Sequence, residues 1–169
     1  MGGNYGDCGS YQGRVAAVPE TGGAPRFFTV DSAAGQSQGA VWMGGAAPVV
    51  DGQGNIWVTS GNGSITSPGR SYDDSDAALE LSSALRLKQY FAPTDWAAQN
   101  ASDLDMSTAP VLLPDGQVLV AGKAGIAYLV DGSHLGGIGG QLATLKSACD
   151  TDIDGGSAAL GTAVFLPCV

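Results

Sequence analysis

The sequence APVVDGQGNIWV at residues 47–58 decides the expected fold, because a similar sequence, APVLLPDGQVLV, recurs at residues 109–120. In each copy an apolar run leads into a tight Asp-Gly turn, and a second apolar run follows. Asp-Gly between two apolar runs is a strong signal for a β-hairpin. A hairpin that recurs along a chain indicates a repeated structural unit. We therefore expect an all-β protein built from repeats.

Each expected hairpin is followed by a Gly-containing turn and then by two more apolar stretches of strand length. These stretches are residues 77–81 and 87–91 after the first hairpin, and residues 126–130 and 141–147 after the second. Helical signal is confined to residues 95–100, where one short turn is expected between a proline and an Asp-rich run. Each unit is thus predicted to contain four antiparallel strands.

The stretches outside these two copies resemble parts of further units. Residues 13–18 and 26–30 match the third and fourth strands of a unit, and residues 161–166 match a second strand. Four-stranded antiparallel sheets that repeat radially are the blades of a β-propeller. We therefore expect a partial propeller with about two full blades. Its predicted segments are residues 1–45, the end of one blade; 46–107, a second; 108–156, a third; and 157–169, the start of another.

Composition supports strands and turns, and it excludes several kinds of partner. The chain has 27 Gly, and 14 of its 16 acidic residues are Asp, which favours turns over helices. Its formal net charge of −9 argues against binding nucleic acid, whose phosphates attract Lys and Arg. It also argues against an anionic membrane surface. No apolar run approaches the roughly 18 residues of a transmembrane helix, so no membrane span is expected.

The three cysteines are Cys8, Cys149 and Cys168. The last two are close enough in sequence to join neighbouring strands, which makes a disulfide between them plausible in an oxidising compartment. Cys8 then lacks a partner or is free, and three reduced, buried thiols remain the alternative. The expected location is extracytoplasmic, either secreted, periplasmic or on the cell surface. The first residues have no basic region and no apolar core, so either an export signal lies outside this chain or the chain is not exported.

The stretch AVPETGG at residues 17–23 resembles a turn of the quinoprotein-like propeller repeat, in which a third strand runs into Thr-Gly. Pro19 stands where that repeat usually has Asp. The family includes alcohol dehydrogenases that depend on pyrroloquinoline quinone (PQQ), and non-enzymatic propellers such as the outer-membrane assembly lipoprotein. The resemblance covers nearly the whole chain and implies a propeller fold.

Resemblance to the PQQ-dependent dehydrogenases also implies functional residues. Asn62, in the pair Gly61-Asn62, resembles their calcium-binding Asn, and Asp74 falls at the place of their catalytic Asp. A later Asp-rich segment resembles residues 103–105. In such an enzyme Asp74 would be the general base that removes the alcohol proton. Calcium held by Asn62 would polarise the quinone carbonyl as a Lewis acid.

Three departures from the dehydrogenases make PQQ an unexpected cofactor. Their quinone-stacking Trp would fall near Gly45, whereas Trp42 lies a few residues earlier. The chain has no adjacent Cys pair to cover the ring, and only seven Lys and Arg residues for a tri-anionic quinone. We therefore expect a non-catalytic interaction scaffold or ligand-binding module, partnered by other propeller blades or by a second copy. The alternative is a fragment of a PQQ- and calcium-dependent alcohol dehydrogenase.

The segment DTDIDG at residues 150–155 suggests a possible calcium site. Alternating Asp residues followed by Gly resemble the beginning of calcium-binding loops, so Asp150, Asp152 and Asp154 are candidate ligands. The twelfth position is Gly161 rather than the Glu of an EF-hand, so backbone carbonyls and water would complete the site. A solvated Asp turn is the alternative. These residues support a third hypothesis, a calcium-stabilised structural domain.

Overall fold

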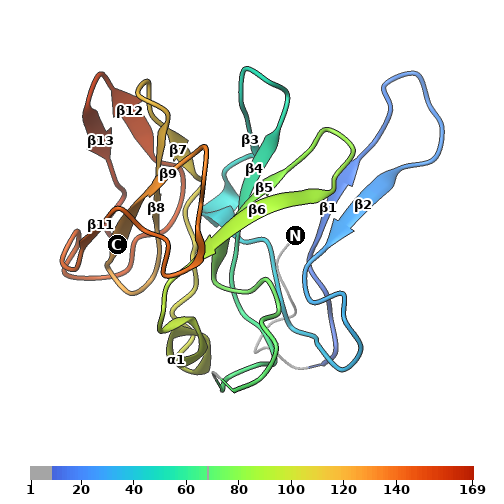
Figure 1. The fold of residues 1–169 in the computed structure, drawn as a ribbon, viewed down its shortest axis with the longest axis horizontal. Coiled ribbons are helices and arrows are strands. Elements are labelled where there is room, and N and C mark those ends of the chain that lie inside the picture. Colours follow the sequence, from blue (N-terminus) through green and yellow to red (C-terminus); the bar gives the residue numbers. More distant parts are fainter. Residues whose placement is uncertain (1–8, 68) are drawn as a thin grey trace.

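The structure is a computed structural model that describes residues 9–67 and 69–169, and it confirms the predicted all-β class. The described strands form four sheets that follow one another along the chain (Figure 1). The strands are β1 (Arg14–Ala17), β2 (Arg26–Thr29), β3 (Val49–Val50), β4 (Ile56–Ser60), β5 (Ala77–Leu81), β6 (Leu87–Ala92), β7 (Val111–Leu112), β8 (Gln117–Ala121), β9 (Ala127–Asp131), β10 (Gly137–Ile138), β11 (Ala143–Leu145), β12 (Ala158–Leu160) and β13 (Ala163–Phe165).

The first predicted hairpin forms β3 and β4, with Val49 opposite Trp57. The side chain of Asp51 closes its turn, because Oδ1 accepts hydrogen bonds from the backbone N–H groups of Gln53 and Asn55 at 2.9 and 2.8 Å. Strands β5 and β6 continue the sheet in antiparallel order, as predicted. A short Asp-anchored turn thus places four consecutive strands side by side.

The second predicted hairpin builds a sheet of the same design. Val111 of β7 lies opposite Leu119 of β8, and Asp115 accepts a hydrogen bond from the Gln117 N–H at 3.2 Å. Strands β9 and β11 follow on, both antiparallel to their neighbours. The predicted strand at residues 141–147 is shorter in the structure. The two sheets share one construction, while their assignment as propeller blades remains a prediction.

Strand β10 was not predicted and joins the two sheets. It pairs in parallel with β6, with Gly137 opposite Phe91, although it belongs by sequence to the following unit. Gly136, Gly137 and Gly139 have φ values between 68° and 77°, in the left-handed region that glycine adopts most easily. The Gly-rich segment can therefore turn sharply enough to reach the neighbouring sheet.

Two strands form each end sheet. Strands β1 and β2 pair at one end, and β12 and β13 pair at the other, with no third strand on either within the described residues. In Figure 1 these end sheets lie on opposite sides of the two larger sheets. The four sheets do not close into a ring within the part of the chain that the structure describes.

Alternating side chains of the first large sheet supply two separate cores. Val58 and Leu79 point to the core shared with β1 and β2, whereas Trp57 and Phe91 point to the core shared with the next sheet. This follows from the two-residue period of a strand, whose neighbouring side chains lie on opposite faces. All five residues of β5 are buried because both of its faces are covered.

The disulfide predicted between Cys149 and Cys168 is confirmed, with the two Cα atoms 5.7 Å apart. It fixes the segment that carries β12 and β13 to the loop after β11, beside the buried side chain of Ile153. Cys8 lies outside the described residues. Among the described residues, no helix is long and apolar enough to cross a membrane.

Candidate functional site

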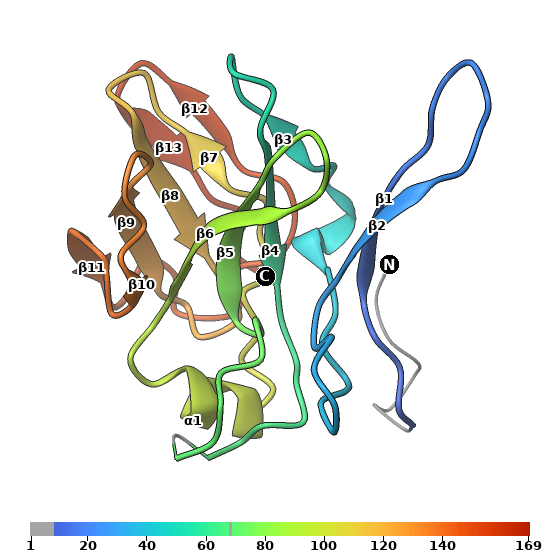
Figure 2. The ribbon, with the colours of Figure 1, turned by 45° about the vertical axis from the view of Figure 1, so that its right-hand side comes forward.

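Several acidic side chains gather at the end of the molecule opposite the hairpin turns. Figure 2 shows this end, where helix α1 (Trp96–Ala101) and the loops between β4 and β5 lie. The backbone brings the loops together, since Ala40 bridges Gly61 and the Asp31 N–H donates to the Asp73 carbonyl at 3.3 Å. The members of this acidic cluster are Asp31, Asp73, Asp74, Asp76 and Asp105. All are buried except the half-buried Asp74.

Asp31 lies at one side of the acidic cluster. Its Oδ2 accepts a hydrogen bond from the Gly39 N–H, while its buried Oδ1 has no hydrogen-bond partner among the residues that the structure describes. Burial, followed by the negative charge of Asp73, raises the pKa of Asp31 to about 8. This carboxyl group therefore carries a proton through most of the neutral range.

Asp73 has partners on both oxygens. Its Oδ1 accepts from the Ser75 hydroxyl at 2.5 Å and from the Ser75 N–H at 3.3 Å. Its Oδ2 accepts from the Ile65 N–H at 3.3 Å. Burial raises the pKa of Asp73, and these hydrogen bonds oppose the change only in part. Asp73 holds the loop before β5 in place.

Asp105 contacts two turns that occupy equivalent positions in the repeat, the turn after β4 and the turn after β8. Its Oδ1 accepts from the Asn62 N–H at 2.6 Å, and its Oδ2 forms an ion pair with the Lys123 ammonium group. The backbone N–H of Lys123 also donates to the Asp105 carbonyl at 3.0 Å. Burial raises the pKa of Asp105, and Lys123 counteracts this.

The glycines before Asn62 and Lys123 allow both turns to approach Asp105. A Cβ on Gly61 would lie 2.5 Å from the Cβ of Asp105, and a Cβ on Gly122 would lie 2.1 Å from the Asp105 carbonyl oxygen. Both distances are too short for any other residue. Asn62 itself has a φ of 56°, so the Gly-Asn pair has a structural reason independent of any ligand.

Within residues 9–67 and 69–169, no hydrogen bond of normal geometry reaches either carboxylate oxygen of Asp76, although its side chain is completely buried. Burial, and then the charges of Asp105 and Asp73, raise its pKa well above the usual range. The Met106 N–H and the Lys123 ammonium group lower this pKa only in part. Asp76 therefore faces other carboxyl groups without enough positive charge to balance them.

The acidic cluster has the chemistry to attract a hard cation, since carboxylate oxygens are the preferred ligands of Ca²⁺. Within residues 9–67 and 69–169, no three Asp, Glu, His or Cys side chains are arranged to ligate one metal ion together. A cation at Asp76 would therefore take its remaining ligands from backbone carbonyls and water.

The structure brings together some of the residues predicted from the resemblance. Asn62 lies beside Asp105, which belongs to the predicted Asp-rich segment at residues 103–105. Asp74 lies in the same cluster, and its backbone carbonyl accepts from the Ser60 hydroxyl at 2.5 Å. Burial and the charge of Asp73 raise the pKa of Asp74. A catalytic role for Asp74 remains a prediction.

The prediction missed Asp31, Asp76 and Lys123. The repeat contains a signal for Lys123, because the turn after β8 is equivalent to the turn after β4 and places Lys123 at the position of Asn62. Lys123 also lies 3.2 Å from Asp103 and 5.9 Å from the centre of the Trp42 ring. A search for the repeat equivalents of Asn62 would have identified it.

The predicted calcium segment, with Asp150, Asp152 and Asp154, lies away from this cluster in the sequence and makes structural contacts. The Asp152 carbonyl accepts from the Val169 N–H at 3.0 Å, and the Asp154 N–H donates to the Pro167 carbonyl at 3.3 Å. Asp150 and Asp152 are exposed. The segment thus anchors the last residues of the chain, and calcium binding by its carboxylates remains a prediction.

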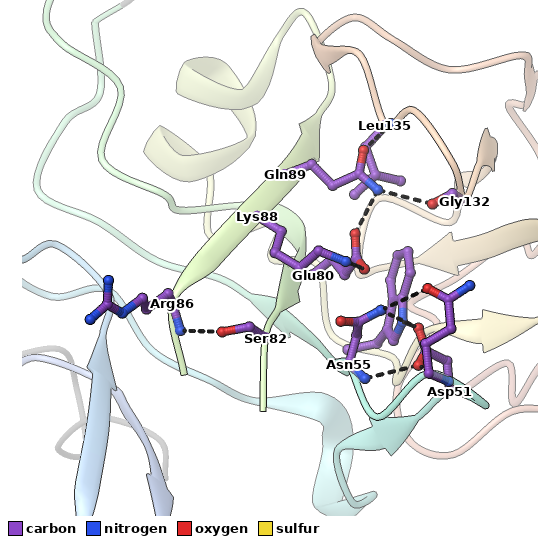
Figure 3. Close-up of polar contacts among 11 residues, drawn as sticks. Asp51, Asn55, Glu80, Ser82, Arg86, Lys88, Gln89, Gly132 and Leu135 are labelled. Carbon is purple, nitrogen blue, oxygen red and sulfur yellow. Dashed lines mark hydrogen bonds and ion pairs between the residues drawn. The ribbon is translucent and has the colours of Figure 1, made fainter. Parts of the chain in front are cut away.

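A second polar region lies between the two large sheets, on the side of the hairpin turns (Figure 3). Glu80 is buried and lies 2.6 Å from both Lys88 Nζ and Gln89 Nε2. The Gln89 side chain also donates to the Gly132 carbonyl at 2.9 Å and accepts from the Leu135 N–H at 2.8 Å. Gln89 therefore links the sheet of β6 directly to the loop after β9.

Asp51 and Trp57 lie at the same cavity, whose volume is about 640 Å³. Asp51 Oδ2 accepts from Asn55 Nδ2 at 2.9 Å and from Trp57 Nε1 at 3.1 Å (Figure 3). Slight burial would raise the pKa of Asp51, but the hydrogen bonds from Trp57 and Asn55 lower it to about 2. The polar side chains of this second region, such as those of Glu80, Gln89, Asp51 and Trp57, have hydrogen-bond partners within the protein. We therefore interpret the region as one that holds the two large sheets together.

No family model and no curated protein matches this chain.

Proposed function

We propose that this chain is a non-catalytic segment of a β-propeller of the PQQ-type repeat family, which serves as a scaffold and binds a hard cation such as Ca²⁺. Two sheets with the same hairpin, the same strand order and the same Asp-anchored turn support the repeat. The Cys149–Cys168 disulfide fits an extracytoplasmic protein, because disulfides persist in oxidising compartments.

One observation carries the cation proposal: both carboxylate oxygens of Asp76 are buried and, among the described residues, have no close hydrogen-bond donor apart from the weak contribution of the Met106 N–H. Burying an unpaired carboxylate is costly, so such a group either takes up a proton or binds a cation. In the part of the chain that the structure describes, one ammonium group, that of Lys123, neutralises the charge nearby, and it already pairs with Asp103 and Asp105. A divalent cation would relieve the repulsion among Asp73, Asp76 and Asp105.

We expect Ca²⁺ to raise the melting temperature of the protein, and Asp76→Asn to remove that effect. Without calcium, the variant should be at least as stable as the wild type, because it removes a buried carboxyl group whose charged form is disfavoured by burial and by the neighbouring carboxylates. Thermal unfolding followed by circular dichroism, with added Ca²⁺ or with a chelator, measures both effects.

The exposed Asp152 provides a matched control. Asp152→Asn should leave the calcium response intact if the cation binds near Asp76. If Asp152→Asn abolishes the response and Asp76→Asn does not, calcium binds in the segment of residues 150–155 and the proposed site is wrong. If the wild type does not respond to calcium, the cation proposal fails.

A PQQ-dependent dehydrogenase is the second candidate, favoured by the meeting of Asn62, Asp105 and Lys123. The residues present do not fit the quinone well, because five acidic side chains and one lysine would repel a tri-anion. We expect no change in the PQQ absorbance spectrum when the protein is mixed with PQQ and Ca²⁺. A spectral change together with alcohol-dependent dye reduction would support the dehydrogenase instead.

A further inference from the structure

The cavity between the two large sheets, on the side of the hairpin turns, has the dimensions of a ligand site. Its volume of about 640 Å³ falls within the range of roughly 300–1,000 Å³ that is typical of small-molecule sites. Its rim comes from both sheets, since it includes the turn after β3, the turn after β7 and the loop after β9. The Gln89 side chain fixes these walls relative to each other through Gly132 and Leu135. A ligand would therefore meet a site that is already formed.

The wall from the first large sheet carries an ion pair with hydrogen-bonding capacity to spare (Figure 3). Lys88 Nζ lies 2.6 Å from Glu80 Oε1, and the Lys88 side chain is 42% exposed. An ammonium group has three N–H donors, and within the described residues Glu80 engages one of them. Each Glu80 oxygen accepts one hydrogen bond, from Lys88 or from Gln89, although it can accept two. The pair can therefore both donate to a ligand and accept from it.

The charges at the cavity disfavour an anionic ligand. Asp51 and Glu80 supply two carboxylates there, whereas Lys88 is the one basic side chain at this cavity in the described part of the chain. A phosphate or carboxylate on a ligand would face this excess of negative charge. A wholly apolar ligand is also disfavoured, because it would remove water from Lys88 and Glu80 without replacing its hydrogen bonds. The cavity therefore suits a neutral, polar ligand.

The wall from the second large sheet offers an apolar surface. Leu112 of β7 pairs with Val118 of β8 in the antiparallel register, so both side chains lie on the face toward the first sheet. Val118 is buried and Leu112 is half-buried, and both line the cavity. A ligand held between the walls would thus contact hydrogen-bonding groups on one side and carbon atoms on the other.

We propose that this cavity binds a neutral, hydroxyl-rich ligand of the size of a disaccharide. A hydroxyl group both donates and accepts hydrogen bonds, so neighbouring hydroxyls can bond to Lys88 and Glu80 together. The C–H groups of a sugar ring would pack against Leu112. The acidic cluster lies at the opposite end of the molecule, so this inference does not depend on the proposed cation site.

An NMR titration of isotope-labelled protein with maltose, cellobiose and lactose tests the inference. At least one of these sugars should shift the amide signals of Gly52, Gly116 and Gly132, which line the cavity, and saturate with a Kd below about 10 mM. The Gly161 signal, in the turn between β12 and β13, should stay unchanged. Citrate, a carboxylate probe, should give no saturable shift at the cavity. Saturation by citrate and not by the sugars, shifts confined to other parts of the chain, or no saturation by any sugar would overturn the inference.

Lys88→Met tests the role of the ion pair. It removes the spare N–H donors and leaves Glu80 hydrogen-bonded to Gln89, so the Kd of a sugar that binds should rise at least about tenfold. Lys146→Met is the matched control, because Lys146 is exposed after β11 and does not line the cavity, and its Kd should equal that of the wild type. An unchanged Kd in a folded Lys88→Met variant would contradict the proposed contacts. The wild-type titration locates the site even if Lys88→Met does not fold.

Discussion

The free energy of unfolding should fall as the pH rises from about 4 to about 8, the reverse of ordinary acid denaturation. Asp31 causes much of this effect, because its pKa rises from the usual value near 3.8 to about 8 in the folded protein. Below pH about 4 the folded and unfolded states are both protonated at Asp31, and its stabilising proton is fully present. Above pH about 8 both states are ionised, and that stabilisation is lost.

The size of the effect follows from linkage between protonation and folding. For one carboxyl group, each pH unit between its pKa in the unfolded state and its pKa in the folded state lowers the free energy of unfolding by up to about 1.4 kcal/mol. Burial also raises the pKa values of Asp73, Asp74, Asp76 and Asp105, so their contributions have the same sign. Over the whole window the loss should reach several kcal/mol, a large part of the stability of a small domain.

Asp31→Asn isolates this contribution. The amide oxygen can still accept from the Gly39 N–H, but the side chain no longer titrates. Urea unfolding at several pH values between about 5 and about 8 gives the slope of the free energy of unfolding against pH. This slope should be smaller for the variant than for the wild type. Asp152→Asn, at an exposed position, should leave the slope unchanged. Equal slopes for the wild type and Asp31→Asn would show that Asp31 is not the main titrating group.

Removal of the Cys149–Cys168 disulfide should lower the free energy of unfolding by about 3 kcal/mol. The loss of stability should be concentrated in the segment that carries β12 and β13. The two cysteines are 19 residues apart, and a loop of that length gives about this chain-entropy effect. The end sheet has few other supports, since β12 and β13 are largely exposed.

Hydrogen exchange can locate the loss from the disulfide. In the double variant Cys149→Ala and Cys168→Ala, amides of residues 158–165 should exchange faster, whereas those of β5 should change little. Reductant should destabilise the wild type and have no effect on the double variant at this site. Uniformly faster exchange throughout the chain would mean that the disulfide supports the whole fold rather than one end.

The strands could be predicted because their signals are local. The Asp-Gly turn at Asp51 and the apolar runs on either side of it specify a hairpin within a few residues. Strand β10 could not be predicted in this way. It has two residues, and within the described chain it pairs with β6 alone, about 46 positions earlier in the sequence. A parallel contact of that kind depends on how the sheets pack.

The acidic cluster could be predicted only in part. Asn62 and residues 103–105 drew attention through a resemblance, and they do lie together. Asp31 and Asp76 look in the sequence like any other Asp beside a turn, because burial and missing partners arise only after the loops meet. Lys123 could have been found from its equivalence to Asn62 in the repeat.

The bridge formed by Gln89 bears on how the chain responds to mechanical force. The Gln89 side chain contacts Glu80, Gly132 and Leu135, and β10 adds backbone hydrogen bonds to β6. The two large sheets should therefore resist an applied force together. The end sheet of β12 and β13 depends on one covalent crosslink and a few backbone bonds. Stretching the protein from its two ends should therefore separate the β1–β2 hairpin first, whereas the disulfide carries the force from Cys168 directly to Cys149 and shields β12 and β13 from it. The central pair of sheets should rupture last as a single unit.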